Sequence, residues 1–233
     1  MAYDGDGIRV SETAGGVTTK YLVDSLNPTG YSQVLDEIVN GAVTKTYTYG
    51  LRLITENQVS GSTWTPSFYG YDGHGNVRFL TNTSGATGNT YQFDAFGAPI
   101  ASTGTIANTY LYSGERFDSN LNLYQLRARY YNMLTGRFET MDPVAGKIFD
   151  PKTLHKYVLT GNNPVNWIDP RGTDIEEDED ILAGDEIDQV ENSFKTLKKY
   201  QNSGTTGYRI STEGTEDELE EAIQQFINLW NSQ

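Results

Sequence analysis

The sequence of 233 residues predicts a mainly β protein, in which antiparallel β-hairpins precede a small α-β-α tail. Alternating side chains, such as VTKTYTY at residues 43–49, are typical of half-buried strands. Pairs containing Gly, among them Asn40-Gly41 and Ser60-Gly61, separate these runs as hairpin turns do. After Thr173 the apolar period changes from two residues to about 3.6, which indicates helices.

A short motif, aromatic-Asp-x-x-Gly, recurs at residues 3–7, 71–75 and 93–97. In each copy we expect the ring to pack on the sheet, the Asp to form an Asx-turn and the Gly to adopt a positive φ. The last two copies lie 22 residues apart, and a repeat of this length buries its apolar face only by stacking on neighbours. Residues 32–38 suit a strand or a short helix. We expect a strand, because the neighbouring runs pair locally.

A further hairpin is predicted close to the middle of the chain. Residues 126–131 alternate as a strand that places Arg127 and Arg129 on one face. A turn at residues 132–136 then leads back to a strand at residues 137–138. The sequence therefore predicts a hairpin with one cationic face.

Turns that contain proline follow this hairpin, and the combination is specific. The motifs are R-A-R-Y-Y (127–131), G-R-F (136–138), D-P-V-A-G (142–146), N-N-P (162–164) and D-P-R-G (169–172). In this order they resemble the core domain that closes RHS/YD-repeat proteins. The resemblance extends to Gly172 and stops there.

The resemblance implies a domain organisation. Residues 1–122 would be YD/RHS-type β-hairpin repeats and residues 123–173 the RHS repeat-associated core domain. In this family such hairpins wind into a hollow shell that precedes a variable C-terminal segment, as in the polymorphic toxins of interbacterial competition. So few repeats cannot close a shell, so we expect the end of a longer protein or a truncated relative.

The resemblance also implies a candidate catalytic pair, Asp142 and Asp169. In the family, the aspartates of the two D-P-x-G turns are implicated in cutting the chain just after the second turn, here between Thr173 and Asp174. Two close carboxylates do not both ionise readily, so one holds a proton and polarises the scissile carbonyl while the other deprotonates water.

Arg129 and Arg137 are candidates to orient this pair. The alternative is that both arginines pair with carboxylates of the sheet or stack on Tyr130 and Tyr131.

Several features leave a purely structural role for the aspartates open. Asp-Pro-x-Gly is by itself a turn sequence. The first turn carries an extra residue, the spacing between the two turns is longer than in the family, and Thr173 stands where Leu is usual. Asp150-Pro151 offers an alternative first turn. A Ser/His/Asp site at His155 is disfavoured, because no nucleophile elbow accompanies it.

The tail is expected to contain an acidic linker at residues 174–184 and an α-β-α unit at residues 185–233. Its first helix would end near Tyr200, and a capping box at Thr215 and Glu218 would begin the last one. The unit contains neither His nor Cys, so we expect it to bind a partner through its apolar stripe and not to catalyse a reaction.

Composition limits the ligands and partners. The net charge is −14, and residues from Asp174 onward hold sixteen acidic and four basic residues, a balance of −12 against −2 before them. Such a tail argues against nucleic acid as a partner. With no Cys and only two His, we expect no cofactor and no metal. The expected partners are the protein's own tail and an immunity or carrier protein.

The same observations support two function classes. The first is the C-terminal part of a bacterial RHS-repeat protein that presents a variable effector, secreted or at the cell surface. The N-terminus MAYDGDGIRV has no signal-peptide pattern, and no stretch is long and apolar enough for a transmembrane segment. The second is a non-catalytic cell-wall or carbohydrate-binding β-repeat module with sixteen Tyr residues. Self-cleavage into two fragments near Thr173 would distinguish the first class from the second.

Overall fold

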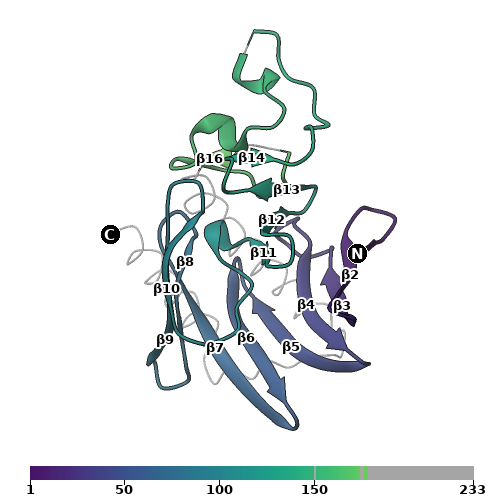
Figure 1. The fold of residues 1–233 in the computed structure, drawn as a ribbon, viewed down its shortest axis with the longest axis vertical. Helices are drawn as coiled ribbons and strands as arrows, with labels where there is room; N and C mark the ends of the chain where they lie inside the picture. Colours follow the sequence, from purple (N-terminus) through teal and green to yellow (C-terminus); the bar gives the residue numbers. More distant parts are fainter. Residues whose placement is uncertain (150, 174–175, 178–233) are drawn as a thin grey trace, which may run out of the picture. The chain divides into compact units, whose positions relative to one another are not determined.

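A computed structural model describes residues 1–149, 151–173 and 176–177 of the chain. Its largest element is an antiparallel sheet of ten strands that pair in sequence order (Figure 1). The strands are β1 (Ala2–Tyr3), β2 (Arg9–Ala14), β3 (Val17–Asp24), β4 (Gln33–Val39), β5 (Ala42–Tyr49), β6 (Leu53–Ser60), β7 (Thr63–Tyr71), β8 (Val77–Thr81), β9 (Thr87–Phe93) and β10 (Pro99–Thr103). The predicted fold class, mainly antiparallel β, is confirmed, and so is the strand expected around residues 32–38. The helices and strand predicted for the tail lie outside the described residues.

The turns of the repeat have the predicted geometry. The Asp94 carboxylate Oδ1 accepts the N–H of Phe96 at 2.9 Å and of Ala98 at 2.8 Å, and Gly97 has a φ of +86°. Asp4 and Asp72 form the same turn. A further copy of the turn departs from the sequence motif, because Thr81 and Asn82 replace the aromatic residue and the Asp. Asn82 accepts the N–H groups of Ser84 and Ala86 in the same way.

A second antiparallel sheet follows in the chain. It contains β11 (Arg116–Asp118), β12 (Leu123–Leu126), β13 (Arg129–Asn132) and β14 (Arg137–Phe138), again in sequence order. Short 3-10 helices occupy Tyr112–Gly114, Pro151–Leu154 and Leu159–Asn162 (η1, η2 and η3). The last described pairing joins β15 (Trp167–Ile168) to β16 (Glu176–Glu177).

The single strand predicted for residues 126–131 is wrong. The chain reverses there, because Leu126 pairs with Arg129 and Arg127 adopts a φ of +45°. Arg127 and Ala128 form a two-residue hairpin turn, so the expected cationic face does not exist. The alternating side chains resembled a single strand, and the turn residues gave no warning, because two-residue hairpin turns usually contain Asn or Gly and not Arg.

Aromatic side chains form the core of the second sheet. Tyr124 and Tyr131 are almost fully buried and face each other across β12 and β13, with ring centroids 6.4 Å apart. Their hydroxyl groups donate to the carbonyl oxygens of Gly97 and Phe96 in the last repeat turn. The core of this sheet is therefore joined directly to the turn between β9 and β10.

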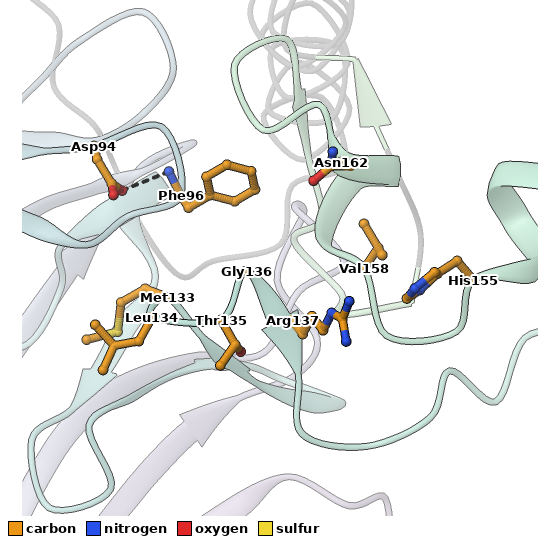
Figure 2. A pocket seen from close by; sticks show the side chains of 10 residues that line it. All are labelled: Asp94, Phe96, Met133, Leu134, Thr135, Gly136, Arg137, His155, Val158 and Asn162. Atoms are coloured by element: carbon orange, nitrogen blue, oxygen red, sulfur yellow. Dashed lines mark hydrogen bonds between the residues drawn. The ribbon is translucent and has the colours of Figure 1, made fainter.

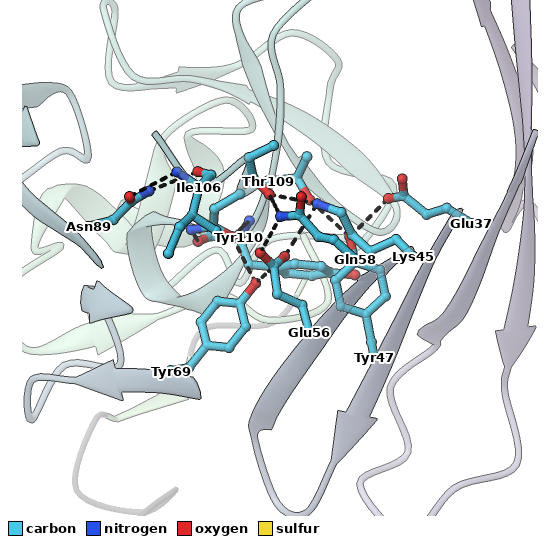
Figure 3. Close-up of polar contacts among 12 residues, drawn as sticks. Glu37, Lys45, Tyr47, Glu56, Gln58, Tyr69, Asn89, Ile106, Thr109 and Tyr110 are labelled. Carbon is cyan, nitrogen blue, oxygen red and sulfur yellow. Dashed lines mark hydrogen bonds and ion pairs between the residues drawn. The ribbon is translucent and has the colours of Figure 1, made fainter. Parts of the chain in front are cut away.

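The ten-stranded sheet has a polar centre (Figure 3). Glu56 is fully buried and accepts from Lys45 Nζ at 3.3 Å and from Tyr69 Oη at 3.0 Å. Lys45 and Gln58 also donate to the carbonyl oxygen of Ala107, in the segment after β10. The segment thus packs on the sheet through hydrogen bonds to its backbone.

Buried ion pairs hold the two sheets together. Arg9 Nη1 lies 2.6 Å from Asp118, and Arg116 Nη2 lies 2.8 Å from Glu37. Burial raises the pKa of Tyr21, on which the Arg116 guanidinium stacks at 4.2 Å. Among the residues that the structure describes, no helix has the length and apolar content that a bilayer span requires.

Candidate functional site

The structure brings Arg129, Asp142 and Asp169 together. Arg129 Nη2 lies 2.9 Å from Oδ2 of Asp142 and 3.2 Å from Oδ2 of Asp169. Both carboxylates are thus within hydrogen-bond range of one nitrogen, although 27 residues of sequence separate them. Asp169 and Arg129 are buried, whereas the Asp142 side chain is 19% exposed.

The two carboxylates are held in similar ways. Oδ1 of Asp142 accepts the N–H of Val144 at 2.8 Å, and Oδ1 of Asp169 accepts the N–H of Thr173 at 2.9 Å. Each turn therefore fixes one oxygen of its aspartate and directs the other toward Arg129. The extra residue in the first turn does not prevent this arrangement.

Arg129 is positioned from several sides. Its guanidinium carbon lies 3.6 Å from the centroid of the Phe138 ring, Nη1 donates to the carbonyl oxygen of Lys156 at 3.2 Å, and Nε donates to that of Gly172. Burial lowers the pKa of Arg129, and Asp142 and Asp169 oppose this shift. An arginine stays charged at neutral pH, so the site contains one fixed positive charge between two carboxyl groups.

The second Asp-Pro turn packs against the hairpin turn between β12 and β13. The N–H of Ala128 donates to the carbonyl oxygen of Arg171 at 3.2 Å, and Arg127 Nη1 donates to that of Pro170. Gly172 has a φ of +72°, and a Cβ there would lie 2.2 Å from the carbonyl oxygen of Leu126. Only glycine fits this close approach without displacing the hairpin.

Arg137 does not join the aspartates. It is exposed on β14 and lines a surface pocket of about 540 Å³ together with His155, Asp94 and seven other residues (Figure 2). Of the described residues that line this pocket, none is Asp142 or Asp169. The proposed orienting role is therefore limited to Arg129, and the suggested stacking of Arg129 is found on Phe138 instead of Tyr130 or Tyr131.

Sequence reasoning missed four residues that support the second turn: Glu115, Arg127, Arg171 and Tyr31. Arg127 Nη1 is paired with both oxygens of Glu115, at 2.9 and 3.1 Å. Burial raises the pKa of Glu115, and Arg127 opposes this shift. The positive φ of Arg127 is the signal of strain at this position, and it is visible only in the structure.

Two more sequence hypotheses concern residues near the site. Asp150, the alternative first-turn aspartate, lies outside the described residues. His155 is exposed and lies in the surface pocket with Arg137. In the described part of the chain, no group of three or more His, Asp or Glu side chains is arranged to hold a metal ion.

Comparison with known proteins supports an RHS-repeat family. The chain is similar to tRNA3(Ser)-specific nuclease WapA of Bacillus spizizenii, with 39% identity over 180 residues. It is also 38% identical over 176 residues to tRNA nuclease WapA of Bacillus subtilis. Each match covers 73% of this chain and 7% of the relative, so the chain spans a small part of these proteins. No family model matches the sequence.

Solved structures show the same fold. The crystal structure of TcdB2-TccC3 matches 73% of this chain and 9% of the other, with a TM-score of 0.54 and 22% sequence identity. The Photorhabdus luminescens Tc holotoxin pore that carries a TccC3 variant matches 76% of the chain with a TM-score of 0.51. The hairpin sheet is thus an architecture found in Tc toxin components.

Proposed function

We propose that this chain is the C-terminal part of an RHS-repeat protein that presents a variable effector, and that it cuts itself after Thr173. The similarity to WapA over 73% of this chain, and the fold shared with the TcdB2-TccC3 structure, support this proposal. The segment after Thr173 would be the effector, and an immunity or carrier protein its partner. Release at the cell surface or outside the cell fits this assignment.

The observation that carries the self-cleavage proposal is the shared nitrogen of Arg129. Asp142 and Asp169 come from distant turns, and both reach Arg129 Nη2 within 3.2 Å. With both carboxyl groups ionised, these three side chains carry a net charge of −1. In the proposed mechanism the pair of carboxyl groups shares one proton, which makes these three side chains neutral together.

The difference in side-chain exposure supports a different role for each aspartate in the proposed reaction. Water reaches Asp142 more easily than Asp169, because their side chains are 19% and 2% exposed. Asp142 therefore takes a proton from water while the water oxygen attacks the carbonyl carbon of Thr173. The proton held by the pair moves to the carbonyl oxygen.

Collapse of the tetrahedral intermediate completes the hydrolysis. The proton that Asp142 received from water passes to the nitrogen of Asp174, and the C–N bond breaks. The products are a carboxyl group on Thr173 and an amino group on Asp174, and one water molecule is consumed. The carbonyl proton returns to the aspartate pair, so the site is regenerated.

The second turn supports this reaction by holding the chain next to the cut. Thr173 N–H donates to Asp169, and the carbonyl oxygen of Gly172 accepts from Arg129 Nε. The peptide group before the scissile bond is thereby fixed at both of its polar atoms. Fixing the reacting segment lowers the entropic part of the barrier.

Replacing either aspartate by asparagine tests the proposal. Asp142→Asn and Asp169→Asn keep the side-chain shape but remove half of the proton-sharing pair, so each should abolish the cut. Asp94→Asn is the matched control, because Asn can keep the turn at residues 94–97, as Asn82 does in its own turn. Gel electrophoresis should show two bands for wild type and the control and one band for the other two. Two bands from both site variants would refute the aspartate mechanism.

A further inference from the structure

The connection between β3 and β4 reaches the second Asp-Pro turn. Its Tyr31 ring contacts two guanidinium groups, with Arg127 Cζ 5.0 Å and Arg171 Cζ 5.4 Å from the ring centroid. Cation–π attraction operates at these distances. Tyr31 lies in a connection of the repeat sheet, whereas Arg127 and Arg171 flank the candidate site, so this contact links residues that are far apart in sequence.

The connection is itself well ordered by hydrogen bonds. Asn27 Nδ2 donates to the carbonyl oxygens of Asp24 at 3.1 Å and Tyr31 at 2.7 Å, and Asn27 Oδ1 accepts the N–H of Thr29 at 3.1 Å. One side chain therefore ties both ends of the connection together. The Tyr31 backbone is held in place before its ring contacts the arginines.

Both arginines are linked to the backbone of the turn that holds Asp169, Arg127 through its side chain and Arg171 as a residue of the turn itself. Arg127 Nη1 donates to the carbonyl oxygen of Pro170, while the carbonyl oxygen of Arg171 accepts the N–H of Ala128. Arg127 sits in a strained left-handed conformation, which needs support from its surroundings. Tyr31 and Glu115 both provide that support, and Tyr31 comes from the connection between two strands of the ten-stranded sheet.

We propose that Tyr31 is a positioning residue through which the repeat sheet completes the aspartate site. The inference rests on the proposed self-cleavage after Thr173. The second turn takes its cleavable geometry only when the β3–β4 connection has folded onto Arg127 and Arg171. Cutting therefore follows folding of the sheet, and the C-terminal segment is not released from an unfolded chain.

Two variants of the full chain test the role of the ring. Tyr31→Leu removes the aromatic face, whereas Tyr31→Phe keeps it and serves as the conservative rescue. The first readout is amide hydrogen exchange at Ala128 and Thr173, whose N–H groups donate to Arg171 and Asp169. The second is the rate of cutting after dilution from denaturant. Exchange at β6 and β7 controls for general loss of stability.

Tyr31→Leu should raise exchange at Ala128 and Thr173 about tenfold, which is the scale of two partly exposed cation–π contacts. It should slow cutting by a similar factor, and Tyr31→Phe should match wild type in both readouts. Unchanged exchange in Tyr31→Leu, or equal losses in both variants, would overturn the inference. An uncut wild type would refute the proposed function instead, and the exchange data would still decide whether the ring holds the turn.

Discussion

Arg129 determines what the candidate site can do at the scale of single residues. Its three nitrogens bind two carboxylates and two carbonyl oxygens, so one side chain fixes both aspartates and the chain next to the proposed cut. A planar guanidinium with five N–H donors suits this arrangement, whereas an ammonium group does not.

Arg129→Lys should therefore retain the charge and lose the geometry. We expect cutting to slow on the order of 10²-fold, because misplacing a reacting group by about 1 Å has that effect. Arg137→Lys is the matched control, because Arg137 is exposed on the neighbouring strand. This variant should be cut at the wild-type rate. A time course followed by gel densitometry measures both variants. Equal rates for Arg129→Lys and wild type would show that the guanidinium is not required.

The resemblance to a known family, and not local physical chemistry, predicted part of this site. Asp142, Asp169 and Arg129 were recognised through motifs, and the structure places them together. The supporting contacts of Tyr31 and Glu115 join segments that are distant in sequence, and nothing in the local pattern marks them. Arg137 belongs to the same motif, but the structure places it away from the aspartates, exposed on β14.

At the scale of elements, the repeat turn joins the two sheets. Gly97 has a φ of +86°, and a Cβ there would lie 2.6 Å from Cγ of the buried Tyr112. Gly7 occupies the same position in the first copy, with a φ of +80° and open space around it. The two glycines thus have nearly the same backbone φ angle but differ in the atoms packed around them.

Gly97→Ala should destabilise the protein more than Gly7→Ala. Left-handed strain costs about 1 kcal/mol at either position, and the clash with Tyr112 adds roughly 1–3 kcal/mol at residue 97. Urea denaturation followed by circular dichroism gives the free energy of unfolding of both variants. Equal losses would show that the turn between β9 and β10 does not pack on the aromatic core.

The buried pair of Lys45 and Glu56 gives a second test at this scale. Lys45→Met leaves the fully buried Glu56 without its cation, and we expect a loss of about 3–5 kcal/mol. Adding Glu56→Leu removes the isolated charge and should recover most of that loss. The same urea titrations measure both. A double variant as unstable as Lys45→Met alone would show that the carboxylate is not the cause.

The sequence predicted the strands better than their junctions. Alternating runs and the aromatic-Asp-x-x-Gly motif identified the repeat hairpins, because side-chain period and turn chemistry are local properties. The reversal at Arg127 was missed, since tertiary contacts stabilise a turn that its own residues disfavour. The polar centre around Glu56 was also missed, because alternation does not show which polar residues point inward.

At the scale of the whole molecule, we propose that the repeat sheet supports a cutting site and that the segment after Thr173 is released. The net charge also changes at Thr173: it is −2 for residues 1–173 and −12 for residues 174–233. The chain spans only 7% of the WapA relatives, so the complete protein's target is a matter for experiment. Experiments on this chain can test whether it cleaves itself after Thr173 or is cleaved by another protease.

The most direct measurement is the intact mass of the wild-type chain after dilution from denaturant at several protein concentrations. We expect two fragments whose masses sum to the mass of the chain plus one water, the smaller beginning at Asp174. Because the reaction is intramolecular, its rate should be first order and independent of concentration. A single full-length mass from a chain whose circular dichroism shows a folded β-sheet would contradict the account, as would a rate that rises with concentration.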